Sequence, residues 1–256
     1  MIPSQAKPSH FTLIELLVVI AILGILVSIL IPSLAKAKYK VKLSVCLATL
    51  SQNGAHLTKY AIANNNKYPA IKGRNDRWSL KNGSVYRTPF LKTVFETDNI
   101  DDNIVCALNP SPSLSDSSAN RIYTSYDFYA GTYLTADSTT GMFFLSKDVT
   151  VDGNLITAVM GDALRTNRSG GNAHTPHPAE GLKHGIADNA SYALGSYRGL
   201  YFKKLDRNFV FKDGHASTIR NISGSSTLND DRFQEISNGP DRGASGSFRA
   251  WVPISK

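Results

Sequence analysis

The sequence predicts an α+β fold, in which one long N-terminal helix precedes a mainly antiparallel β-sheet domain. The first observation behind this prediction is an apolar run over residues 11–31, which continues as an amphipathic stretch to about residue 64. The second is a change after Pro69, where short strand-like runs alternate with turn formers. About 190 residues follow the helix, and that length is enough to bury a separate core.

The apolar run 11–31 contains only four residues that are neither Ala nor large and apolar: Thr12, Glu15, Gly24 and Ser28. A helix of this length spans roughly 30 Å, about the hydrocarbon thickness of a bilayer. We therefore predict a transmembrane helix over residues 11–34. Glu15 lies one turn inside it, where a carboxylate costs on the order of 3 kcal/mol. Either Glu15 has a positive partner in an apolar setting, or it is an end-of-span residue that reaches the headgroups.

The amphipathic part of the helix is predicted over residues 35–64. Its apolar stripe has spacings of three and four residues, which places one face on the soluble domain: Leu43, Leu47, Leu50, Gly54, Leu57 and Ala61. The run Asn64-Asn65-Asn66 favours a helix end. Pro32 leaves one helical carbonyl unpaired and Gly24 is a weak helix former, so both could loosen the membrane half.

The remaining segment, residues 65–256, is predicted to be a β-rich globular domain. Asp213-Gly214 between two strand-like runs indicates a β-hairpin. The predicted strands are 123–129, 142–145, 155–160, 200–202, 209–212 and 215–219. Residues 109–120, 169–181 and 222–231 are polar and rich in turn formers, and are predicted loops.

The two cysteines, Cys46 and Cys106, allow one disulfide in an oxidising compartment. Two buried free thiols are the alternative, because Cys is among the most buried residue types.

The formal charge of +8 would permit contact with nucleic acid or an anionic surface. The basic residues are spread out except for Lys36, Lys38, Lys40 and Lys42, directly after the apolar run. A lysine cluster at this place more often contacts lipid headgroups, so no specific nucleic-acid partner is predicted. By the positive-inside rule alone, the same cluster would place the C-terminal part in the cytoplasm.

The side chains offer two candidate metal sites, and we predict neither. His174, His177, His184 and His215 with Asp162 and Asp213 could bind zinc, but prolines place the first pair in an irregular loop. Asp148, Asp152 and Asn154 could bind calcium through oxygen ligands, although Asp152-Gly153-Asn154 is equally explained as a turn. No hydrolase, zinc-protease or phosphate-loop motif is present, so we predict that the chain has no cofactor and is not an enzyme.

At Phe11-Thr12-Leu13-Ile14-Glu15 and the apolar run that follows, the chain resembles type IV prepilins and type II secretion pseudopilins. This resemblance implies a leader peptide over residues 1–10, cut between His10 and Phe11 by a prepilin peptidase, and N-methylation of Phe11. It also implies that Glu15 pairs with the free amine of a neighbouring subunit. The family usually has Gly before the cut, where this chain has His10.

Further positions resemble prepilin-like proteins of planctomycete- and lentisphaera-type bacteria. They are Cys46 to Pro69, Cys106, Tyr126 and the run Asn208 to His215, which includes Asp213 and Gly214. The resemblance implies a pilin-like fold and a single-pass protein of the bacterial inner membrane. Its C-terminal domain would be periplasmic or in an extracytoplasmic filament. Other pilin or pseudopilin subunits and an assembly platform protein would be its partners.

Two functions therefore remain open. The first is a structural subunit of a pilus-like or pseudopilus filament. The second is an uncut, membrane-anchored module that binds DNA or polysaccharide. They differ in whether Glu15 is required.

Overall fold

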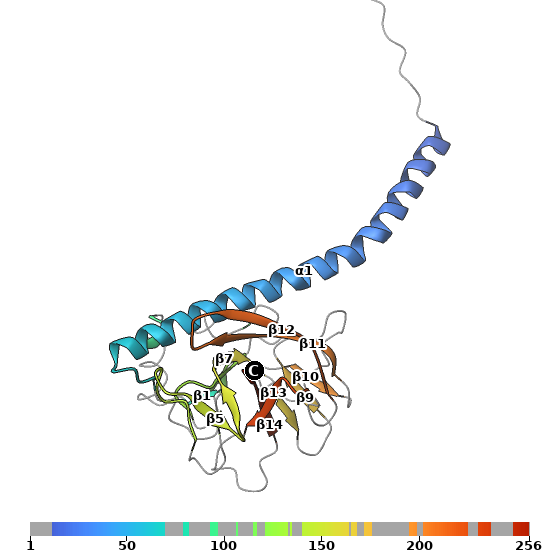
Figure 1. Cartoon of the computed structure of the whole chain (residues 1–256). Coiled ribbons are helices and arrows are strands. Elements are labelled where there is room, and N and C mark those ends of the chain that lie inside the picture. The colour runs from blue at the N-terminus through green and yellow to red at the C-terminus, as the bar shows by residue number, and fades with distance from the viewer. Residues whose placement is uncertain are drawn as a thin grey trace, which may run out of the picture. The chain divides into compact units, whose positions relative to one another are not determined.

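The computed structural model describes residues 12–69, 79–81, 93–96, 106, 115–116, 121–132, 134, 140–163, 165–167, 172–175, 195–198, 202–224, 230–236 and 248–255. The described residues form an α+β arrangement, with one long N-terminal helix followed by antiparallel sheets (Figure 1). The chain divides into two compact units, residues 1–41 and residues 42–256.

The first unit contains the apolar half of helix α1 (Leu13–Ala63). The helix continues through Gly24 and Pro32, the two predicted weak points. Pro32 has no amide hydrogen to donate to the Ser28 carbonyl. One turn earlier, the Ser28 hydroxyl donates to the Ile25 carbonyl, at 2.7 Å. This half of α1 is therefore helical despite both residues.

The second unit contains the other half of α1, which ends at the predicted place. Asn65 and Asn66 adopt positive φ angles of 57° and 61°, a conformation that Asn tolerates better than most residues. The Asn64 side-chain amide donates to the Tyr60 carbonyl at 2.8 Å. The asparagine run ends the helix because it supplies both the left-handed backbone and a local donor for a terminal carbonyl.

The strands of the second unit are short except for one hairpin. They are β1 (Ser79–Lys81), β2 (Ser115–Asp116), β3 (Arg121–Tyr123), β4 (Tyr126–Phe128), β5 (Val149–Val151), β6 (Asn154–Ile156), β7 (Ala158–Asp162), β8 (Arg165–Asn167), β9 (Asn172–Thr175), β10 (Gly195–Arg198), β11 (Phe202–Phe211), β12 (Ala216–Gly224), β13 (Phe233–Ile236) and β14 (Phe248–Pro253). The two larger sheets have the orders β12-β11-β7-β4 and β10-β9-β8-β14-β13. The two smaller ones are β1-β3-β2 and β5-β6.

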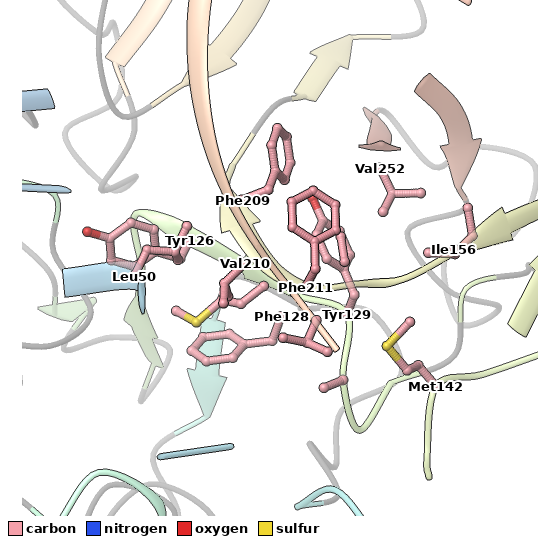
Figure 2. Close-up of a cluster of buried hydrophobic side chains, with 14 of the residues drawn as sticks. Leu50, Tyr126, Phe128, Tyr129, Met142, Ile156, Phe209, Val210, Phe211 and Val252 are labelled. Carbon is pink, nitrogen blue, oxygen red and sulfur yellow. The ribbon is translucent and has the colours of Figure 1, made fainter. Parts of the chain in front are cut away.

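Helix α1 packs on the four-stranded sheet through a narrow, buried stripe. At Gly54 the helix comes so close that an added Cβ would lie 2.4 Å from Cγ2 of Val210 in β11. Leu50 is fully buried in the same hydrophobic cluster (Figure 2). The predicted face of the helix is therefore the buried face, although Leu47 is only half-buried and Cys46 and Asn53 complete the stripe.

The opposite face of this sheet packs on the five-stranded sheet. Side chains alternate along β11, so Phe209 points away from the face that holds Val210. The Phe209 ring lies 5.8 Å from the ring of Phe233 in β13, measured between ring centroids. The Tyr129 hydroxyl donates to the Trp251 carbonyl of β14 at 3.2 Å. The second unit thus has three layers, in the order helix, four-stranded sheet and five-stranded sheet.

Asn208, a buried polar residue of β11, joins the helix to the two neighbouring strands β7 and β12. The Asn208 backbone N–H donates to Oδ2 of Asp162 in β7 at 2.7 Å, and its side-chain amide donates to the Leu43 carbonyl of α1 at 3.2 Å. Its side-chain oxygen accepts from the Thr218 hydroxyl of β12 at 2.7 Å. Tyr126 of β4 lies opposite Asp162 of β7. Its burial, and then the nearby Asp162 carboxylate, raise the pKa of the Tyr126 hydroxyl. Asn208 therefore sets the register between helix and sheet.

Cys46 and Cys106 form a disulfide, one of the two states left open by the sequence. Both residues are buried, and the bond joins α1 to a position 60 residues further along the chain. In the entropic account of disulfide stabilisation, closing a loop of this length raises the free energy of the unfolded chain by about 4 kcal/mol.

Several predicted strand boundaries are wrong. The predicted strand 123–129 is split between β3 and β4, which belong to different sheets, and 155–160 is split at Thr157 between β6 and β7. Residues 142–145 form only isolated bridges. The predicted loops 109–120 and 169–181 contain β2 and β9, and β12 extends into the predicted loop 222–231. Polar runs form these strands because neighbouring strands supply backbone partners, which local propensity does not register.

We predict that Gly54→Ala destabilises the second unit, although Ala is the better helix former. The new methyl would overlap Val210, and overpacking costs about 1–3 kcal/mol against a propensity gain of about 1 kcal/mol. Denaturant unfolding of the full chain in detergent, followed by tryptophan fluorescence, measures the change.

Gly24→Ala is the matched control in the same helix, because in the described part of the chain nothing beyond its neighbours and the adjoining helix backbone lies within 4 Å of the added Cβ. The variant Gly54→Ala/Val210→Ala should be less destabilised than the sum of its single changes. Equal effects of Gly24→Ala and Gly54→Ala would contradict the close approach.

Candidate functional site

The first turn of α1 places Glu15 against Thr12. The Thr12 backbone N–H and hydroxyl each donate to Oε2 of Glu15, both at 2.8 Å, and the Glu15 backbone N–H donates to the Thr12 hydroxyl at 3.2 Å. This reciprocal arrangement is a capping box, with Thr12 as the N-cap residue. Both bonds to the carboxylate use Oε2, and no described residue donates to Oε1, which can therefore accept from a further donor.

This local role of Glu15 was not predicted from the sequence. The signal was present, because Thr-x-x-Glu before an apolar run is a helix-start pattern. In the isolated chain Glu15 therefore has a structural function, because its bonds with Thr12 cap the start of the helix at Leu13. Thr12 donates hydrogen bonds to the Glu15 carboxylate but carries no positive charge that could neutralise it.

The apolar residues that follow are exposed over a long segment of α1. Leu13 is 79% exposed and Ile31 is 62% exposed, and the large aliphatic side chains between them are exposed as well. By length and composition this segment is long and apolar enough to cross a membrane. The exposure encircles the helix, whereas a helix that packs on a soluble domain has one apolar face. This surface requires an apolar environment on all sides.

The predicted processing residues His10 and Phe11 lie outside the described residues, as does the rest of the predicted leader 1–10. Of the other predicted site residues, Glu15, Gly24 and Pro32 lie on one helix.

The predicted Asp213-Gly214 hairpin is present as β11 and β12, but its turn also includes Lys212. The Phe211 N–H donates to the His215 carbonyl at 3.0 Å, and the Gly214 N–H donates to the Phe211 carbonyl at 2.9 Å. Gly214 has a φ of +88°, which suits glycine. This pattern is a three-residue loop in which a turn is followed by a left-handed glycine, rather than a two-residue turn.

Asp213 and His215 form an exposed pair at the tip of this hairpin. Oδ1 of Asp213 accepts from the His215 backbone N–H at 3.1 Å and lies 2.6 Å from Nδ1 of the ring. The ring stacks on Phe211 with a centroid separation of 4.3 Å. The backbone hydrogen bond, followed by the side-chain contact, lowers the pKa of the Asp213 carboxyl. The His215 ring thus contacts both Asp213 and Phe211 at the hairpin tip.

The calcium candidates have protein partners in the structure. Asp152 and Gly153 form the turn between β5 and β6, both at positive φ, as the turn interpretation implied. Gln234 of β13 donates to Asp152 at 2.8 Å and accepts from Asn154 at 2.7 Å, and Asp148 lies 3.4 Å from the Lys212 ammonium. Gln234 therefore connects the β5–β6 turn to β13 through polar side chains.

The histidine candidates are not brought together among the described residues. Asp162 is buried beside Asn208, whereas His215 is exposed at the hairpin tip with Asp213. His174 lies in β9, and His177 and His184 are outside the described residues. No group of three or more His, Cys, Asp or Glu in the described part of the chain could hold a metal ion.

In comparisons with family models, curated proteins and solved structures, nothing matches this chain.

We predict that the pKa of Asp213 lies below its ordinary value of 3.8 in the folded chain. Because the folded-state pKa is lowered, this carboxylate stabilises the hairpin above about pH 4 and loses that contribution as the pH falls through the lower value. An NMR titration of the Asp213 carboxyl in the full chain measures it.

His215→Ala keeps the backbone donor and should leave most of the lowering in place. A value at or above 3.8 in the unsubstituted chain would contradict the hydrogen-bonded tip.

Proposed function

We propose that this chain is a structural subunit of a type IV pilus-like or type II secretion pseudopilus filament, anchored and assembled through α1. The observation that carries the proposal is an encircling apolar surface with a single carboxylate in its first turn. An ordinary anchor needs the apolar surface and could use Glu15 only as a helix cap, a role that does not require a charge inside the membrane.

The apolar surface supports both stages of a subunit's life. In the membrane, lipid covers the exposed side chains from Leu13 to Ile31. In a filament, the same side chains are covered by the helices of neighbouring subunits. The two environments are equally apolar, so the helix can move from one to the other without exposing this surface to water.

The carboxylate supports assembly with a defined register. In the proposed subunit, cleavage after His10 leaves Phe11 with a free, N-methylated amine. Thr12 holds Oε2 of Glu15, so the carboxylate is oriented while Oε1 is available for the amine of a neighbour. A charge pair in an apolar layer is strong, and breaking it would leave a buried charge without a partner.

The remaining parts of the proposal follow from the family resemblance. A prepilin peptidase processes the chain, and an assembly platform protein at the inner membrane accepts it. The disulfide suits an oxidising compartment, which agrees with a periplasmic or filament location for the second unit. We propose no catalytic role and no metal.

The uncut, membrane-anchored binding module is the second candidate. It is favoured by His10 at the position of the usual Gly and by the formal charge of +8. In that case Glu15 serves only as the helix cap.

We predict that the mature chain begins at Phe11. Intact-mass measurement and N-terminal sequencing of the protein from its native membrane test this directly. A mass that includes residues 1–10 would favour the uncut anchor and would remove the amine on which the proposed pairing depends.

A second prediction separates the charge of Glu15 from its capping role. Glu15→Gln keeps an oxygen acceptor for Thr12 and removes the charge, whereas Glu15→Leu removes both. We expect both variants to insert in the membrane and both to reduce sheared filaments at least tenfold, as judged by immunoblotting.

The two candidates differ in the Gln variant. If Glu15 is only a cap, Glu15→Gln and the unsubstituted chain should give the same amount of sheared filament. Full filament formation by Glu15→Gln would exclude charge pairing as the assembly interaction.

A further inference from the structure

Three lysines encircle α1 directly beyond its apolar segment. Lys36, Lys38 and Lys40 are exposed residues of the first unit. At 1.5 Å per residue, Lys36 lies about 7.5 Å along the axis from Ile31 and Lys40 about 13.5 Å. The headgroup layer on each side of a bilayer is roughly 5–8 Å thick. Lysine stems reach back several ångströms along a helix, so all three ammonium groups can reach that layer.

The lysines do not share one face. Successive residues of an α-helix are about 100° apart, so Lys40 is about 40° from Lys36, and Lys38 is about 200° away. A straight polyanion such as a DNA duplex would contact one side of the helix and leave the other charged side unused. A layer of lipid headgroups surrounds a spanning helix and contacts both sides.

The helix itself supplies no negative charge to these lysines. After Glu15, α1 contains no Asp or Glu, so the acidic side chains of the helix do not offset the positive charge of this segment. Tyr39, which is half-buried, lies among the lysines, and tyrosine is enriched where membrane helices cross the headgroup layer. The segment thus combines the charge and the aromatic residue of a membrane-interface anchor.

We propose that Lys36, Lys38 and Lys40 form a collar that binds anionic phospholipid headgroups around α1. The inference rests on the proposed membrane anchoring of α1, but it does not require cleavage or filament assembly. The collar would fix the depth of the helix in the bilayer. It would also keep the subunit in the membrane until neighbouring subunits replace the lipid contacts.

The test uses the full chain in nanodiscs that contain equal amounts of phosphatidylglycerol and phosphatidylcholine. Native mass spectrometry counts the lipids that remain bound after release. We expect phosphatidylglycerol to be retained about fivefold or more over phosphatidylcholine, the ratio that corresponds to one lysine–lipid contact. The triple variant Lys36→Gln/Lys38→Gln/Lys40→Gln should reduce this ratio to near one.

The matched control removes three charges elsewhere, with Lys59→Gln/Lys67→Gln/Lys147→Gln in the second unit. It should keep the lipid preference. An unchanged ratio in the collar variant, or an equal loss in the control, would overturn the proposal. So would a collar variant that loses binding of a DNA duplex and keeps its preference for phosphatidylglycerol.

Membrane anchoring is tested separately by resistance to alkaline extraction from vesicles of phosphatidylcholine alone. A chain that is extracted from these vesicles contradicts the anchor and the collar together. A chain that resists extraction but shows no lipid preference contradicts only the collar.

Discussion

The second unit depends on the contact between α1 and the central strand β11. Gly54 lets the helix backbone approach Val210, and Asn208 joins the same strand to the Leu43 carbonyl. The same strand contributes Phe209 to the opposite face, against β13. Because one strand contributes to both interfaces of the core, a shift of its register by one residue would turn Phe209 toward the helix and Val210 toward β13, and neither side chain would fit. The disulfide between Cys46 and Cys106 further ties the helix to the chain beyond it.

The same helix meets two different demands along its length. Its first half exposes apolar side chains all round, and its second half buries a narrow stripe that includes a glycine and a buried asparagine. The proposed function uses this division, because a segment without a fixed protein partner can exchange lipid for neighbouring helices. The apolar half nevertheless begins with a charged residue. The hydrogen bonds from Thr12 to Glu15 solvate this carboxylate.

Much of this organisation could be predicted from local patterns. The helix, its end at the asparagine run and the β11–β12 hairpin all follow from short-range signals, namely periodicity, left-handed propensity and an Asp-Gly pair. The candidate site was predicted in part. The apolar run and the unusual position of Glu15 were evident, whereas the bond to Thr12 was missed although its four-residue pattern was visible. The strand boundaries failed at Thr124 and Thr157, where the chain moves from one sheet to another.

The sequence by itself therefore determined the elements whose causes lie within a few residues of one another: the long helix, its apolar and amphipathic halves, and the main hairpin. Only the tertiary structure decided which cysteine state forms, which strands share a sheet, and that Asn208 connects α1, β7 and β12. These outcomes depend on groups that are far apart in the chain. Their hydrogen bonds and close contacts are specified by the packed arrangement, and a local pattern contains no record of it.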